Sequence, residues 1–89
     1  YTTLFRSGIG ISIAANKVPG IRAALVTSPE MAALAKQHNN ANVLALGGRI
    51  LSLESAEACV AAWLDASFEG DRHQRRLDRI SEIEANSCQ

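Results

Sequence analysis

The chain has 89 residues, 47% of them hydrophobic and 4% aromatic, and its nine Lys and Arg balance nine Asp and Glu. This length suits one small domain, and the apolar content excludes a disordered chain. The zero net charge argues against nucleic-acid and membrane-surface binders, which carry a basic excess. The sequence has no transmembrane run and no signal-peptide pattern. Cys59 and Cys88 do not make a disulfide framework, so we expect reduced thiols and a cytoplasmic protein.

Helix and strand patterns alternate along the chain. The predicted elements are a helix at 11–17, a strand at 21–26, a helix from 29 to near 38–40, a strand at 42–46, and helices at 52–68 and 72–84. Ser28 has the position of a helix N-cap, with Pro29 at the first helical position, and Asp71 is the expected cap of the last helix.

Apolar residues three and four apart predict which helix faces are buried. They are Met31, Leu34 and Ala35, then Leu53, Ala56, Val60, Trp63 and Leu64, and finally Leu77, Ile80, Ile83 and, weakly, His73. Alternating strands and helices predict an α/β fold with a parallel sheet. Two strands are too few for a stable sheet of this kind, so we expect further strands upstream.

The loop before the first helix is a candidate anion site. Ser7, Gly8, Ile9 and Gly10 stand where a strand should pass into a helix. Glycines there let backbone N–H groups point at a phosphate or a developing oxyanion, and the helix dipole adds to the attraction. A tight turn without a ligand explains the same residues.

Four polar side chains are further candidates. His38 and Asn39 end a helix, where a His can act as an acid, but Asn is an ordinary helix-end residue and a lone His is more often structural. Arg49 follows the second strand, where it can hold a carboxylate or phosphate or simply lie in solvent. Arg72 and Arg76 share a helix face, which suits a phosphate. Pairing with Asp78 and Glu82 on a solvated face is the alternative, and no metal-ligand spacing is present.

Three stretches in register, 8–24, 37–49 and 68–78, resemble the carboxyl-terminal half of the ribose-5-phosphate isomerase B family, which also holds the galactose-6-phosphate isomerase subunits. The resemblance implies half of a Rossmann-like three-layer sandwich, with sites between two subunits of a homodimer or larger homo-oligomer. It implies no metal, cofactor, nucleic acid or membrane. The loop of Ser7, Gly8, Ile9 and Gly10 would then be the anion hole.

The resemblance also implies roles for the polar side chains. His38 would assist opening of the sugar ring as an acid, and Asn39 would bind substrate. Arg49, Arg72 and Arg76 would bind substrate, chiefly its phosphate. The implied reaction converts ribose 5-phosphate into ribulose 5-phosphate by proton transfer through an enediolate.

Two departures from the family pattern concern the catalytic base. Phe5 stands where the family has a Cys base and Arg6 where it has a glycine, while Ile11 stands where one branch has a Glu. Residues 1–7 resemble a translated sequencing adapter, so we expect a non-native leader followed by the carboxyl-terminal part of one isomerase domain at 8–89. We therefore expect the complete protein to be an isomerase and this chain alone to be inactive.

Three other readings remain open from the sequence. The chain can belong to a galactose-6-phosphate isomerase subunit, since those subunits share the implied fold. It can be a non-catalytic phosphosugar-binding or assembly subunit that keeps Arg49, Arg72 and Arg76 without a base. It can also be an α/β structural fragment without a site.

Overall fold

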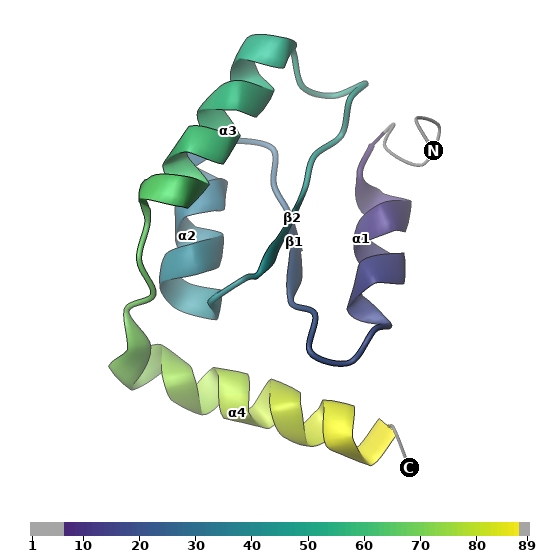
Figure 1. Ribbon diagram of the computed structural model, residues 1–89, viewed down its shortest axis with the longest axis vertical. Coiled ribbons are helices and arrows are strands. Elements are labelled where there is room, and N and C mark those ends of the chain that lie inside the picture. Colours follow the sequence, from purple (N-terminus) through teal and green to yellow (C-terminus); the bar gives the residue numbers. More distant parts are fainter. Residues whose placement is uncertain (1–6, 88–89) are drawn as a thin grey trace.

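The computed structural model describes residues 7–87, apart from the side chains of Asp71 and Ser87. The described elements are, in order, α1 (Ile9–Asn16), β1 (Ala23–Leu25), α2 (Pro29–Asn39), β2 (Val43–Ala45), α3 (Leu53–Asp65) and α4 (Gly70–Ser87) (Figure 1). Phe5, Arg6 and all of the predicted leader except Ser7 lie outside the described residues.

The two strands form a parallel sheet in which Ala24 lies opposite Leu44. Helix α1 covers one face of this sheet, and α2 and α3 cover the other (Figure 1). This arrangement confirms the predicted α/β class and its three layers. Each strand is shorter than the apolar run that predicted it, because the outer residues of each run continue into loops and turns.

The ends of α2 confirm the predicted caps. The Ser28 hydroxyl oxygen accepts a hydrogen bond of 3.2 Å from the Met31 backbone N–H, and Pro29 occupies the first turn. Asn40 ends the helix in the left-handed conformation, with φ 46°. An Asn tolerates this conformation better than most residues, so the chain can turn sharply into β2.

The core lies between the sheet and the α2–α3 layer. Its fully buried members are Val26, Ala32 and Cys59, and Trp63 packs beside them. The Lys36 ammonium lies 4.8 Å from the centre of the Trp63 ring and so links α2 to α3 by a cation–π contact. Small side chains fill this interface, which lets the two helices approach closely.

The predicted buried faces of α2 and α3 were right for Ala35 and Trp63, which pack against the core, but wrong for Met31 and the large aliphatic side chains. Met31, Leu34, Leu53, Val60 and Leu64 are exposed, with Leu53 at 76%. In both helices the stripe of alanine and cysteine faces the sheet instead. Where an alanine-rich helix has apolar residues all around, periodicity alone cannot choose the inward face.

The boundaries of the last two helices also differ from prediction. Helix α3 ends at Asp65, because Ala66 is extended (φ −79°, ψ 153°). Helix α4 begins at Gly70, so Asp71 lies inside its first turn and is not its cap. On α4 the weakly predicted His73 is buried along with Leu77, whereas Ile80 and Ile83 are exposed.

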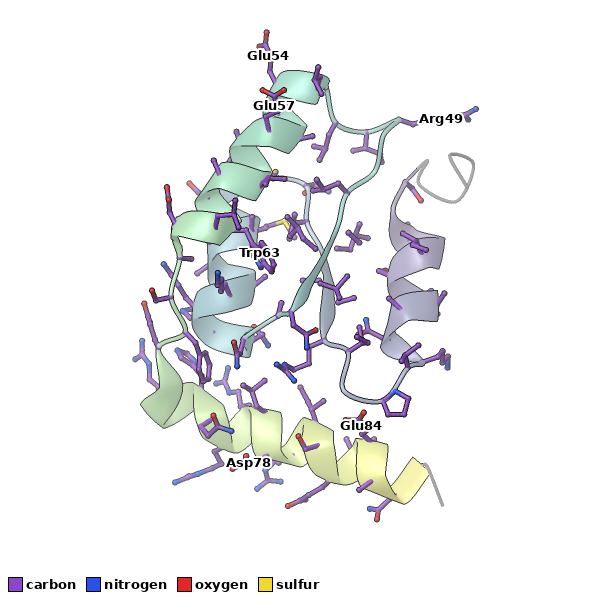
Figure 2. The ribbon with its side chains drawn as sticks, viewed as in Figure 1. Arg49, Glu54, Glu57, Trp63, Asp78 and Glu84 are labelled. Carbon is purple, nitrogen blue, oxygen red and sulfur yellow. The ribbon has the colours of Figure 1, made fainter. Side chains whose placement is uncertain are left out.

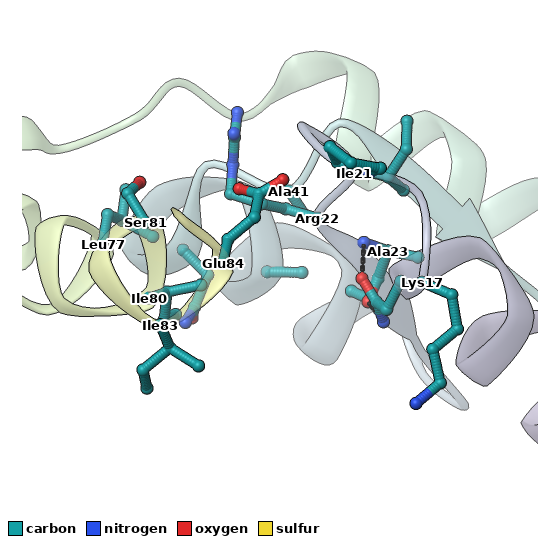
Figure 3. Close-up of a pocket in the computed structure, with 15 residues that line it drawn as sticks. Lys17, Ile21, Arg22, Ala23, Ala41, Leu77, Ile80, Ser81, Ile83 and Glu84 are labelled. Carbon is teal, nitrogen blue, oxygen red and sulfur yellow. Dashed lines mark hydrogen bonds between the residues drawn. The ribbon is translucent and has the colours of Figure 1, made fainter. Parts of the chain in front are cut away.

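Helix α4 runs across the amino ends of the two strands and is held near both of its ends. At its start, the Glu69 N–H donates to the Gln37 carbonyl at 2.9 Å. Near its end, the Glu84 carboxylate accepts a hydrogen bond from the Gly20 N–H. A mainly apolar groove of about 560 Å³ separates α4 from the strands, with Leu77 and Ile80 on its α4 side (Figure 3).

Among the described residues, no helix has both the length and the apolarity needed to cross a membrane.

We expect the isolated chain to associate through its exposed apolar side chains. Ile9 and Ile13 lie one turn apart on α1 and are 53% and 56% exposed, and burying an Ile is worth about 1.5–3 kcal/mol. Sedimentation should therefore give a mass above 9.5 kDa. Ile9→Glu combined with Ile13→Glu should shift the chain towards the monomer, whereas Ala14→Glu should not. A cooperative unfolding transition from a monomer of the unaltered chain would contradict this expectation.

Candidate functional site

The loop 7–10 lies at the carboxyl ends of the strands, against Gly47. Gly8 precedes α1 with φ 85°, and a Cβ atom at this position would lie 3.2 Å from the Gly47 nitrogen. A Cβ atom at Gly47 would overlap the Ser7 carbonyl group. The two backbones are therefore in direct contact, which fixes the loop at the end of β2.

The backbone around Ser7 is held by local hydrogen bonds at the start of α1. The Ser7 hydroxyl accepts a hydrogen bond of 3.3 Å from the Ile9 N–H, and Ser12 Oγ donates to the Ile9 carbonyl at 2.7 Å. The first turn of α1 contains no acidic residue that would compete with an anion. Arg49 is exposed in the loop that follows β2, at the same end of the sheet as the start of α1 (Figure 2). We call Ser7, Gly8, Ile9, Gly10 and Arg49 the carboxyl-end cluster.

Four predicted site residues lie at the other end of the strands. His38 is half-buried and Asn39 exposed at the end of α2, and both Arg72 and Arg76 are exposed on α4. The two arginines are four residues apart, so they lie roughly 6 Å from each other along the helix axis. We call His38, Asn39, Arg72 and Arg76 the amino-end cluster.

His73 joins the two helices that carry the amino-end cluster. Its ring stacks on the His38 ring, with 4.2 Å between the centroids and 20° between the planes. His73 is only 6% exposed, and its Nε2 atom has no hydrogen-bond partner. Burial lowers the pKa of His73, and the nearby positive charges of His38 and Arg72 lower it further.

The sequence pattern placed His73 only weakly on the apolar face of the last helix and did not single out Glu69 as a candidate site residue. The Glu69 carboxylate lies within 4.8 Å of ring nitrogens of both His38 and His73. The four-residue spacing from Glu69 to His73 is a signal that could have drawn attention to this pair. The contact with His38 depends on tertiary structure, since α2 and α4 are far apart in sequence.

The same three side chains carry atoms that metals bind, but their arrangement does not favour a metal ion. An imidazole binds a metal through a lone pair in the ring plane. The planes of His38 and His73 are stacked and nearly parallel, so their lone pairs do not converge on one point. One of the rings would have to turn and break the stack before both could bind the same ion.

The structure therefore brings the predicted residues together as two clusters and not as one site. The strands lie between them, since Arg49 is at one end of the molecule and α4 with its labelled Asp78 is at the other (Figure 2). One cluster offers backbone N–H groups and a guanidinium, and the other offers an imidazole and two guanidiniums. Both sets of groups are of the kind that can bind an anion.

Comparison with known proteins identifies the family. The sequence model described as Ribose/Galactose Isomerase matches residues 3–80. The chain belongs to this family. The chain is 54% identical over 78 residues to ribose-5-phosphate isomerase B of Escherichia coli, covering 88% of this chain and 52% of that protein. It is 51% identical over 78 residues to the probable ribose-5-phosphate isomerase B of Mycoplasma genitalium, with 88% and 51% covered.

Solved structures of this ribose/galactose isomerase family have the same fold. Ribose-5-phosphate isomerase B of Clostridium thermocellum matches with a TM-score of 0.90 at 52% identity, over 92% of this chain and 55% of that one. The Mycoplasma genitalium enzyme with bound ribulose-5-phosphate matches with a TM-score of 0.87 at 51% identity, over 89% and 52%. The chain thus spans about half the length of the relatives it matches.

The contact between Ser7 and Gly47 predicts the effect of a methyl group at Gly47. Gly47→Ala should lower the free energy of unfolding by roughly 1–3 kcal/mol, because the new Cβ overlaps backbone that has little freedom to shift. Gly10→Ala is the matched control: its Cβ meets nothing within 4 Å, and it should raise helix stability by up to about 1 kcal/mol. Equal urea midpoints for the unfolding of the two variants would contradict a close contact between Gly47 and the Ser7 backbone.

The lowered pKa of His73 predicts that stability depends on pH. Between the folded-state pKa and the ordinary value of 6.5, the unfolded chain binds more protons than the folded chain. The free energy of unfolding should therefore rise with pH across this window, and this stability is lost as pH falls below 6.5. Denaturation of the unaltered chain and of His73→Phe across the window measures the difference. A steeper pH dependence in His73→Phe would contradict burial of a neutral His73.

Proposed function

We propose that this chain supplies the carboxyl-terminal half of an aldose–ketose isomerase that converts ribose 5-phosphate into ribulose 5-phosphate. The single observation that supports this most is the family match at about 50% identity, which includes a relative with ribulose-5-phosphate bound. The amino-end cluster is a further support, because His38 stacks on α4, the helix on which Arg72 and Arg76 are exposed, and two guanidiniums suit a phosphate.

In the proposed reaction, His38 first donates a proton to the ring oxygen of the cyclic sugar, and the C1 hydroxyl loses its proton as the aldehyde forms. A base then removes the proton from C2, and the carbonyl oxygen at C1 becomes an oxyanion. Backbone N–H groups of the loop 7–10 stabilise this enediolate. The base returns its proton to C1, and the C2 hydroxyl proton passes to the oxygen on C1, which completes the ketose. Arg72 and Arg76 hold the phosphate throughout.

The base is the part that the described residues do not supply. Ile11, at the position where a branch of the family has a Glu, is apolar and half-buried. The described members of the carboxyl-end cluster include no carboxylate and no thiol. We therefore propose that the chain alone is inactive. A non-catalytic phosphosugar-binding subunit is the second candidate function, favoured by this same lack of a base.

We further propose a homodimer or larger homo-oligomer in which each site takes one cluster from each of two subunits. The two clusters lie on opposite ends of the strands, so one chain cannot enclose a single small substrate with both. Two copies can place the carboxyl-end cluster of one against the amino-end cluster of the other. All the relatives named above are called ribose-5-phosphate isomerases. These names favour ribose 5-phosphate over galactose 6-phosphate as the substrate.

Two further proposals concern the cell and the chain's first residues. The free, buried thiol of Cys59 supports a cytoplasmic protein. We also propose that residues 1–7 are a non-native leader and that 8–89 are the isomerase part. The family match begins at residue 3 and so overlaps the leader, and the source DNA upstream of Ser7 tests this directly.

The function is tested by restoring the other half. We fuse residues 7–89 behind the upstream half of the Escherichia coli relative and assay ribose 5-phosphate and galactose 6-phosphate. The fusion should isomerise ribose 5-phosphate, and the 89-residue chain should give only the background rate. Activity of the chain alone would contradict its proposed inactivity, and a folded fusion that binds but does not isomerise sugar phosphate would favour the binding subunit.

The role of the two arginines is measured in the same fusion. Arg72→Ala with Arg76→Ala should weaken substrate binding by roughly 2–4 kcal/mol, since two charge-assisted hydrogen bonds to phosphate are lost. Arg75→Ala, which removes an exposed charge from the same helix, is the control and should leave KM unchanged. Unchanged sugar-phosphate affinity in the double variant would leave only a structural role for α4.

A further inference from the structure

The buried imidazole of His73 has no place in the reaction described above, yet it stacks on the ring of His38. Its ring lies parallel to that of His38 at 4.2 Å, and it comes from a different helix. A stacked ring restricts the plane of its neighbour, because tilting His38 would bring it into His73. The direction in which His38 can offer a proton is thereby fixed.

The surroundings of His73 oppose a positive charge on its ring. The groups that face it are His38 on α2, Glu69 before α4, and Arg72 and Arg76 on α4. Three of these carry or can carry positive charge, and only the Glu69 carboxylate favours protonation. A protonated ring would also place a charged Nε2–H in a buried position where it has no acceptor.

We propose that His73 is a positioning residue for His38, and that the stacked pair carries no more than one proton, with His38 as the acid and His73 as a neutral platform. Two adjacent imidazolium rings repel each other, so a neutral His73 lets His38 carry the proton that ring opening needs. This inference rests on the proposed function for the role of His38, but the stack and its charge state do not depend on activity.

The charge state is tested in the 89-residue chain, which has only two histidines and hence two imidazole signals in NMR. His73 should titrate below 6.5. Replacing His38 by Asn should raise the pKa of His73, because the neighbouring charge is gone. Arg75→Ala is the control and should leave the His73 titration unchanged. Titration of His73 at or above 6.5, or no response to His38→Asn, would overturn the proposal that His73 is neutral beside His38.

The positioning role is tested by kinetics in the fusion. His73→Ala should lower kcat about 10–100-fold with little change in KM, because His38 loses the ring that orients it. His73→Phe keeps a stacking ring without a titrating group, so it should retain more of kcat than His73→Ala. A merely structural residue would change stability without a loss confined to kcat and without rescue by Phe. Wild-type kcat in His73→Ala, or an equal loss of kcat in His73→Phe, would overturn the positioning role.

The titration of the chain and the kinetics of the fusion test this inference and the proposed function separately. A fusion without isomerase activity would contradict the function, while the titration in the chain itself would still decide whether His73 remains neutral beside His38.

Discussion

The parallel pairing of β1 with β2 is the constraint on which the other features of this chain depend. Parallel strands point the same way, so the segments after both strands meet at one edge and the segments before them meet at the other. This pairing brings Gly47 against Ser7 and Gly8 at the carboxyl edge. At the amino edge, the Asn16 side chain makes two hydrogen bonds to the Ala23 backbone, and Asn42 accepts from the Arg22 N–H at 2.7 Å. Asparagine amides thus continue the hydrogen bonding where the short strands end.

Small side chains decide how the helices pack on this sheet. Ala32 and Cys59 are fully buried, whereas Leu53 and Leu64 point away from the core. Close packing of small residues brings α2 near α3, and the Lys36–Trp63 contact joins them at the surface. The large aliphatic side chains that remain outside give the chain an apolar surface, which is consistent with a domain that buries more surface in a larger assembly.

The two clusters differ in the groups that they contain. In the carboxyl-end cluster, the contact with Gly47 fixes the backbone around Ser7 and Gly8. The amino-end cluster combines permanent charge at Arg72 and Arg76 with an imidazole whose plane is set by His73.

The sequence by itself determined the local features of this protein. It predicted the caps at Ser28 and near Asn40, because capping depends only on neighbouring residues. It predicted the α/β class from alternating patterns, and it predicted the family from three motifs in register. Tertiary structure alone decided which stripe of α2 and α3 is buried, because alanine-rich helices have apolar residues on several faces. It also decided that the site residues divide between two ends of the strands, and that His73 stacks on His38. Those relations join residues far apart in the chain, so they follow from the register of the strands and the path of α4 and from no local pattern.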